Sequence, residues 1–253
     1  MKRIRITAAI LGAATAMNMA KGTEVSLSLD AASAYVFRGA TFNDGAVLQP
    51  GMEVSGMKLG EFEIPITLGV WGNLDLDKNE AEGEDGSKET VAASGKFSEV
   101  DLYASLEMPT LVEGLDWSVG YTEYLYPQAG GDPDREVNIA FAVDTMLAPA
   151  FTAYYGVDGL IEKSTYLEFG VSHGFALTDA LGLELGATLG YLIPDEGEEG
   201  FNSLDLSAAL SWKAVTASVV YVAQLDDEVL VDVEDGGLYD VEVVGMISLA
   251  QTF

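Results

Sequence analysis

Apolar side chains recur at every second position through most of the chain, and this alternation constrains the fold more than any other sequence feature. Between residues 25 and 37 the odd positions are mostly apolar, whereas the even positions are mostly small or polar. A period of two is typical of β-strands whose two faces meet different surroundings. Comparable apolar rows occupy residues 62–70, 100–106, 137–143, 165–171, 181–191, 204–212 and 241–249. With weaker segments near residues 46–57, 115–126, 150–157 and 215–225, the pattern predicts twelve strands and an all-β fold.

The connections between these segments alternate in length. Short turns are expected near residues 56–60, 109–114, 146–149, 174–180 and 213–214. Longer or more acidic connections are expected at residues 39–45, 76–97, 127–133, 158–163, 194–202 and 226–237. The sequence therefore predicts a single antiparallel transmembrane β-barrel of about 12 strands, with short periplasmic turns and longer acidic extracellular loops. A secreted sandwich is the alternative, but it would have to bury nearly a dozen strand faces in one domain.

The first twenty residues have the pattern of a signal peptide. Lys2, Arg3 and Arg5 form a positive start, an apolar stretch follows over residues 6–14, and small residues flank a cleavage site. We expect cleavage after Ala16 or Ala20, which leaves residues 21–253 as the barrel. The alternative, a membrane anchor, is disfavoured because a spanning helix needs about 20 apolar residues. Export to the outer membrane of a Gram-negative bacterium is the expected destination.

Composition excludes several kinds of function. Asp and Glu number 41 against 12 Lys and Arg, so the formal net charge of −29 disfavours nucleic-acid binding. The chain has no Cys and one His, and His173 shares parity with the apolar row of its segment, which points it toward lipid. We therefore expect no catalytic residues, no metal site, no cofactor and no enzymatic activity. A lipid-modifying barrel enzyme, which would need this His, is the least favoured hypothesis.

The face opposite the apolar rows is rich in carboxylates. We assign these residues to the lumen and its charge selectivity: Arg38, Glu53, Glu63, Asp101, Glu107, Glu168, Glu184, Asp205, Asp240 and Glu242. The aromatic residues assigned to the lumen are Trp71, Tyr103, Tyr124, Tyr126, Tyr154 and Tyr166. Rings of carboxylates attract cations and repel anions. The aromatic residues either brace the wall, which is favoured, or line a path for sugars and aromatic solutes.

Arg38 is expected at the outer end of the first strand, facing the lumen. Closure of the barrel would place the first strand beside the last, where Asp240 and Glu242 have inward parity. Because a guanidinium binds carboxylates with two parallel hydrogen bonds, we predict an ion pair that clamps the closing seam.

Aromatic residues on the apolar face predict two girdles at the membrane interfaces. The outer girdle would contain Tyr35, Phe37, Tyr191 and Tyr239. The inner girdle would contain Phe62, Trp117, Phe151, Trp212 and Phe253. The C-terminal Phe253 is of the kind that the barrel assembly machinery recognises. The expected partners are therefore this machinery, outer-membrane lipid and lipopolysaccharide.

Three segments resemble a known family. They are Ser33-Ala34-Tyr35-Val36-Phe37-Arg38-Gly39, then Leu48-Gln49-Pro50, then Leu68-Gly69-Val70-Trp71-Gly72-Asn73. They are similar to the Gcw-chp family of exported bacterial outer-membrane β-barrel proteins, which has a Tyr-x-x-Arg-Gly signature. The resemblance is clearest over residues 25–76 and implies an outer-membrane location. It carries over no catalytic residues, because the family has no agreed function.

Two functions remain open. The first is a narrow, passive, cation-preferring channel for small solutes, in which luminal acids set the charge preference and extracellular loops gate access. The alternative is a non-conducting structural or interaction barrel whose acidic loops bind divalent cations, polysaccharide or a partner protein. Glu80, Glu82, Glu84 and Asp85 are candidate oxygen ligands for such cations. The loop that starts at Asp75 is not an EF-hand, because Glu80 stands at position six, where Gly is needed, and Gly86 at position twelve, where Glu is needed.

Overall fold

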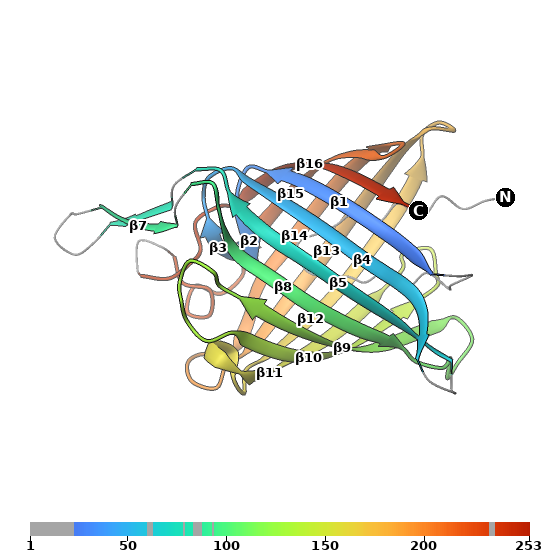
Figure 1. Ribbon diagram of the computed structural model, residues 1–253, viewed down its shortest axis with the longest axis horizontal. Coiled ribbons are helices and arrows are strands. Elements are labelled where there is room, and N and C mark those ends of the chain that lie inside the picture. The colour runs from blue at the N-terminus through green and yellow to red at the C-terminus, as the bar shows by residue number, and fades with distance from the viewer. Residues whose placement is uncertain (1–22, 60–62, 78, 83–87, 93, 233–235) are drawn as a thin grey trace.

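Twelve antiparallel strands close into a barrel in the computed structural model, which describes residues 23–59, 63–77, 79–82, 88–92, 94–232 and 236–253 (Figure 1). The predicted all-β barrel and its strand number are confirmed. The predicted signal peptide and Phe62 lie outside the described residues. The barrel strands are β1 Glu24–Ala32, β4 Val47–Leu59, β5 Ile64–Asp75, β8 Lys96–Glu107, β9 Leu115–Leu125, β10 Asp134–Val143, β11 Ala150–Asp158, β12 Thr165–Ala176, β13 Leu181–Ile193, β14 Gly200–Trp212, β15 Val215–Gln224 and β16 Val243–Thr252.

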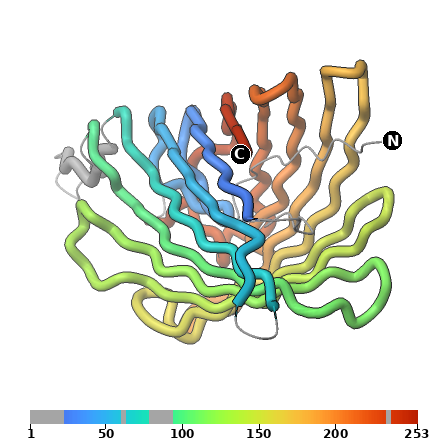
Figure 2. The backbone as a smooth tube through the Cα atoms, turned by 45° about the vertical axis from the view of Figure 1, so that its right-hand side comes forward, coloured from blue at the N-terminus to red at the C-terminus, as the bar shows by residue number. Residues whose placement is uncertain are grey.

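The barrel closes between its first and last strands. Strand β1 pairs with β16, with Leu29 opposite Leu249, and its other edge pairs with β4. Figure 2 shows β1, in blue, and β16, in red, side by side at this seam. Closure leaves none of the twelve barrel strands with an unpaired edge, which removes the usual site of edge-to-edge aggregation from the barrel wall.

The outer surface of the barrel is apolar. Side chains that alternate along the strands are large, hydrophobic and exposed: Leu27, Leu29, Leu68, Leu102, Val137, Phe151, Phe169, Leu185, Leu206, Val219, Ile247 and Leu249. Water-soluble proteins rarely expose a contiguous apolar area of this extent, whereas a membrane barrel presents such a band to lipid. Within the described residues no helix is long and apolar enough to cross a membrane.

The two ends of the barrel differ. Both termini of the barrel chain lie at the end with the shorter turns, which we call the short-turn end (Figure 1). At the opposite, long-loop end, β6 Asn79–Glu82 and β7 Lys88–Ala92 form a hairpin that extends beyond the barrel, and a 3₁₀ turn covers Gly159–Ile161. A further hairpin, β2 Tyr35–Phe37 and β3 Ala40–Asn43, also lies at this end.

Candidate functional site in the barrel lumen

Residues 33–45, which we call the inner hairpin, leave the barrel wall and enter the lumen. Strand β1 ends at Ala32, and the chain bends at Ser33 and Ala34 before β2 begins. The Ser33 amide donates to the Gly245 carbonyl at 2.9 Å, and the Gly245 amide donates to Ser33 Oγ at 3.0 Å. These bonds hold the start of the inner hairpin at the seam, so the residues that follow must turn inward.

At its tip, the inner hairpin places Arg38 against the far wall of the lumen. Arg38 Nη1 and Nη2 donate to the two carboxylate oxygens of Glu136 at 3.1 and 3.0 Å. Glu136 lies on β10, next to β11. Strand β11 is directly opposite β1 in the closed barrel, because it is the sixth strand from β1 in either direction. The Arg38 side chain is 16% exposed and that of Glu136 is 2% exposed. This ion pair therefore joins opposite walls through the middle of the lumen.

Aromatic rings surround the guanidinium of Arg38. Its Cζ lies 4.3 Å from the ring centre of Tyr154, 4.6 Å from that of Tyr166 and 4.7 Å from that of Phe37. Tyr154 on β11 and Tyr166 on β12 are directly opposite each other in register. A cation over an aromatic face is attracted by the electron-rich centre of the ring, and more strongly where water is excluded. We call Arg38, Phe37, Tyr124, Glu136, Tyr154 and Tyr166 the Arg38 site.

Glu136 also accepts a hydrogen bond from Tyr124 OH at 2.6 Å, so both of its oxygens are satisfied. Burial alone would lower the pKa of Arg38. The neighbouring Glu136 and Tyr124 outweigh this effect and raise the pKa, so Arg38 stays charged. The main chain is fixed as well, because Asn202 Nδ2 donates to the Arg38 carbonyl at 2.7 Å.

The predicted seam clamp between Arg38 and the last strand is wrong. Asp240 and Glu242 lie before β16 begins and are exposed. Arg38 instead lies in a turn, with φ at +52°, between the two strands of the inner hairpin. The prediction assumed that the first strand continues to Phe37, whereas the bend at Ser33 carries Arg38 across the lumen.

Gly39 permits the tip of the inner hairpin to approach the wall. Its φ is +82°, a conformation that disfavours side chains. A Cβ at this position would lie 2.8 Å from Leu230 Cδ2 and 3.0 Å from Ser203 Cβ. The Tyr-x-x-Arg-Gly pattern thus has a structural explanation, since Tyr35, Arg38 and Gly39 all hold the inner hairpin in place.

The remainder of the inner hairpin forms an apolar core inside the barrel. The core consists of Ala32, Ala34, Tyr35, Val36, Val47, Val220, Val222, Leu230, Tyr239, Val244 and Met246. Tyr35 OH donates to Glu99 Oε2 at 3.0 Å, and Asn43 Nδ2 donates to Asp75 Oδ1 at 2.6 Å. One side of the lumen at the long-loop end is therefore packed with protein rather than filled with water.

This core corrects part of the predicted outer girdle. Tyr35 and Tyr239 are buried, Phe37 contacts Arg38, and Tyr239 OH donates to the Val222 carbonyl at 3.0 Å. None of the three faces lipid. Tyr191 lies on β13 with its ring 5.0 Å from that of Phe201, an exposed residue of the neighbouring β14.

At the short-turn end, Trp212 and Phe253 are exposed. Trp117 on β9 stacks on Phe141, and its Nε1 donates to the Pro109 carbonyl at 2.9 Å. Phe151 is exposed on β11.

The structure brings most of the predicted luminal acids to the inner face. Within β8, Leu102 is exposed on the outer surface. The side chains of opposite parity, Asp101, Tyr103 and Glu107, face the lumen and are partly buried. The inward acids Glu53, Asp101, Glu107, Glu168, Glu184 and Asp205 come from β4, β8, β12, β13 and β14. Glu63 is different, because it occupies a turn with φ at +50°, pairs with Lys58 at 3.1 Å and is 71% exposed. Its assignment to the lumen was wrong.

The predicted luminal aromatic residues divide into three groups. Tyr124, Tyr154 and Tyr166 belong to the Arg38 site. Trp71 has its ring centre 5.6 Å from that of Tyr35, and Tyr103 OH donates to Glu53 at 3.4 Å. Tyr126 follows β9 at the long-loop end, where its OH donates to Asp134 at 2.9 Å.

Sequence reasoning did not find the roles of Glu136 and Asn202. Glu136 has inward parity on β10, whereas Asn202 shares the parity of the outward Leu206 and is buried beyond a shift in the β13–β14 register. Parity also does not say which inward side chains meet across a lumen. His173 Nδ1 lies 2.7 Å from the Met146 carbonyl, and its ring packs edge-on against Phe175.

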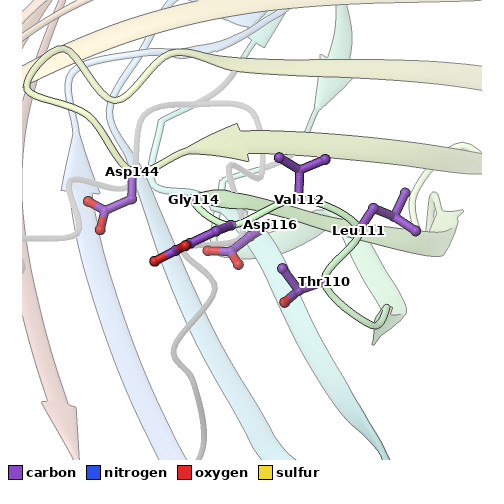
Figure 3. Close-up of a pocket in the computed structure, with 7 residues that line it drawn as sticks. Thr110, Leu111, Val112, Gly114, Asp116 and Asp144 are labelled. Atoms are coloured by element: carbon purple, nitrogen blue, oxygen red, sulfur yellow. The ribbon is translucent and has the colours of Figure 1, made fainter.

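A pocket of about 350 Å³ opens at the short-turn end, lined by Thr110, Leu111, Val112, Glu113, Gly114, Asp116 and Asp144. Figure 3 shows these residues on the strand ends and turns around the pocket. Three carboxyl groups, those of Glu113, Asp116 and Asp144, line the pocket. No group of three or more His, Cys, Asp or Glu residues suited to a metal ion occurs in the described part of the chain. The side chains of Glu80, Glu82, Glu84 and Asp85 lie outside it.

Three solved structures match this chain over most of its length. One, reported as "Unveiling the Mechanism Behind the in-meso Crystallization of Membrane Proteins", is 9% identical with a TM-score of 0.50, over 91% of this chain and 84% of that chain. OmpF of Salmonella typhi in complex with daunomycin is 7% identical, with a TM-score of 0.39 over 92% and 97% of the two chains. Outer membrane phospholipase A from Escherichia coli is 10% identical, with a TM-score of 0.44 over 90% and 88%.

No curated protein sequence matches this chain. At such low identities the likeness to these structures concerns the fold alone. The profile of a family described as "Bacterial protein of unknown function (Gcw_chp)" matches residues 16–180, which is well over half of the sequence. The chain belongs to the Gcw_chp family.

Proposed function

We propose that the protein is a cation-preferring channel for small solutes in the outer membrane, and that its own inner hairpin narrows the lumen at the long-loop end. The observation that carries this proposal is the imbalance of charge on the inner face. Arg38 is the one basic side chain buried inside the described part of the barrel, and Glu136 already neutralises it.

Six inward acids have no basic partner. Within the described residues, Glu53, Asp101, Glu107, Glu168, Glu184 and Asp205 form no ion pair. An isolated carboxylate is very costly to bury in a dry interior, so these groups carry charge where water or mobile cations reach them. A wet lumen lined by carboxylates raises the local concentration of cations and excludes anions.

The inner hairpin limits the size of the solute. Barrels of about 8 strands fill with side chains, whereas wide aqueous channels have about 16, and this barrel lies between them. The apolar core and the Arg38 site together cross the lumen at the long-loop end. The proposal therefore expects small conductance in the resting barrel and larger conductance when the hairpin is removed.

The barrel wall allows a clean removal of the inner hairpin. Ala32 and Val47 are paired in register on β1 and β4. Replacing residues 33–46 by Asn-Gly joins these positions with the two-residue turn that antiparallel strands prefer. The replacement keeps all twelve barrel strands and takes away the obstruction.

Planar-bilayer recording tests the proposal on both forms. In a salt gradient, the intact barrel should show small conductance steps with a reversal potential of the cation-selective sign. The hairpin-replaced barrel should show larger steps of the same sign. Combining Glu53→Gln, Asp101→Asn and Glu107→Gln should reduce the selectivity, whereas Glu63→Gln, on an exposed turn, should not. Absence of steps from both folded forms, or anion selectivity, would contradict the proposal.

A structural or interaction barrel is the second candidate, and the tight packing of the inner hairpin favours it. Gly39 packs so closely against Leu230 and Ser203 that a Cβ would not fit. Such close packing is consistent with an inner hairpin that blocks the lumen permanently. This candidate predicts that the intact barrel never conducts, and that only the hairpin-replaced form shows steps. The same recordings therefore separate the two functions.

A further inference from the structure

We propose that the far wall of the lumen carries a binding site for guanidinium compounds, and that Arg38 occupies this site as a tethered ligand. The inference deepens the proposed function and rests on it for the entry of cations, because it names the class of cation that the lumen recognises. Its binding test does not depend on conduction.

The carboxylate of Glu136 has the geometry of a guanidinium receptor. Both of its oxygens accept from Arg38, at 3.0 and 3.1 Å, in the parallel arrangement that a planar fork requires. Tyr124 OH holds the carboxylate in this orientation through its own hydrogen bond at 2.6 Å. An ammonium group is a point charge without a fork and cannot make both bonds in this way.

The rings of the wall suit a flat cation. Tyr154 and Tyr166 belong to the strands themselves, so both remain when the inner hairpin is absent. Their centres lie 6.3 Å apart and each is within 5 Å of the guanidinium carbon. A weakly hydrated, delocalised guanidinium stacks on aromatic faces more readily than a strongly hydrated ammonium.

Two buried acceptor atoms lie beside the Arg38 site. Asn202 is 3% exposed, and its Oδ1 has no hydrogen-bond partner within the described residues. This oxygen adjoins Tyr166 OH, because a Cβ built on Gly190 would meet both atoms within 2.4 Å. In the described part of the chain Asp205 Oδ1 is likewise buried without a hydrogen-bond partner, although the Asp205 carboxyl group hydrogen-bonds Ser203, and Asp205 interacts electrostatically with Glu168. A solute larger than the Arg38 side chain, with further N–H groups, would find acceptors here.

Arg38 can be removed without straining the turn. Its φ of +52° lies in the left-handed region that glycine adopts readily. Arg38→Gly therefore empties the site and keeps the backbone conformation. The hairpin-replaced barrel empties the same wall by a second route and loses only Phe37 from the aromatic surroundings.

Thermal unfolding of the folded barrel in detergent measures occupation of the emptied site, with methylguanidinium chloride as the probe. For Arg38→Gly, the probe should raise the unfolding temperature in a saturable manner. Methylammonium chloride at matched ionic strength should require a concentration about tenfold higher for half of the effect, because it lacks the fork. The intact barrel should show no such shift, since Arg38 fills the site.

Two further variants make the test decisive. Adding Glu136→Gln to Arg38→Gly should abolish the difference between the two probes. If Arg38→Gly does not fold, the hairpin-replaced barrel is titrated in its place, with and without Glu136→Gln. Equal responses to both cations, no saturable shift, or a preference that survives Glu136→Gln would overturn the inference. Binding without conduction would support the guanidinium site and contradict the proposed channel. Cation-selective conduction without this binding would support the channel and contradict the guanidinium site.

Discussion

The contact between Arg38 and Glu136 places a full ion pair where little water reaches it. Each charge would be costly to bury alone, and the pair is tolerated because Arg38 and Tyr124 satisfy both carboxylate oxygens. Removing one partner leaves the other charge buried. The pair is therefore a weak source of net stability when it is intact and a strong source of instability when it is broken.

The first prediction compares the same substitution in two ion pairs. Glu136→Gln should lower the free energy of unfolding by about 3 kcal/mol, because it leaves the Arg38 guanidinium buried without a counter-charge. Glu63→Gln should cost less than about 1 kcal/mol, since Lys58 and Glu63 are 54% and 71% exposed. Urea titration of the folded barrels measures both. Equal losses would contradict the buried position of the Arg38 pair.

The second prediction separates backbone strain from crowding at Gly39. Gly39 and Gly114 both have φ at +82°, but a Cβ on Gly114 meets nothing within 4 Å. Gly114→Ala should cost about 1–2 kcal/mol for the left-handed conformation alone. Gly39→Ala should cost about 1–3 kcal/mol more, because its Cβ crowds Leu230 and Ser203. The two unfolding free energies would be indistinguishable if the inner hairpin did not touch the wall.

At the scale of the elements, the alternation of residues predicts the barrel strands well because the two faces meet opposite surroundings. Strands such as β8 and β13 expose their apolar row and turn the other row inward. The same alternation does not predict the inner hairpin. Tyr35 and Phe37 continue the parity of β1, and an apolar row packed inside a barrel has the same pattern as one that faces lipid.

Local signals for the chain reversal are present but weak. Ser33 and Ala34 are small residues at the bend, and Arg38 and Gly39 both adopt positive φ in the turn. Gly39 alone is a common turn residue, and nothing in the sequence indicates that Arg38 meets Glu136, 98 residues later. Contacts across the lumen depend on the closure of the whole barrel, so local pattern could place each residue on a face but could not pair them.

The third prediction concerns the independence of the barrel from its inner hairpin. The hairpin-replaced chain should still fold, because Ala32 and Val47 remain paired and each barrel strand keeps both neighbours. It should be less stable than the intact chain, because the apolar core around Val36, Val222 and Val244 is lost. Heat-dependent mobility on denaturing gels reports both properties. A variant that never folds would show that the hairpin is needed to form the wall.

At the scale of the whole molecule, the barrel has two concentric surfaces, an apolar exterior and an acidic interior. The fourth prediction is that cation preference weakens as salt rises, because the Debye length shortens from about 10 Å at 0.1 M to about 3 Å at 1 M. Reversal potentials measured at a fixed concentration ratio and increasing total salt report this change. A preference that does not vary with salt would mean that the mobile ions do not sense the carboxylates through water.

The most direct test of these two surfaces uses the absence of cysteine from the chain. Ser105→Cys and Leu102→Cys place single thiols on the two faces of β8, inward between Tyr103 and Glu107 and outward on the apolar surface. After reconstitution into lipid bilayers, charged methanethiosulfonate reagents are applied. The account predicts that the inward thiol reacts faster with the cationic reagent than with the anionic one, and that the outward thiol reacts with neither. Equal labelling of both positions, or faster anionic labelling of the inward thiol, would contradict it.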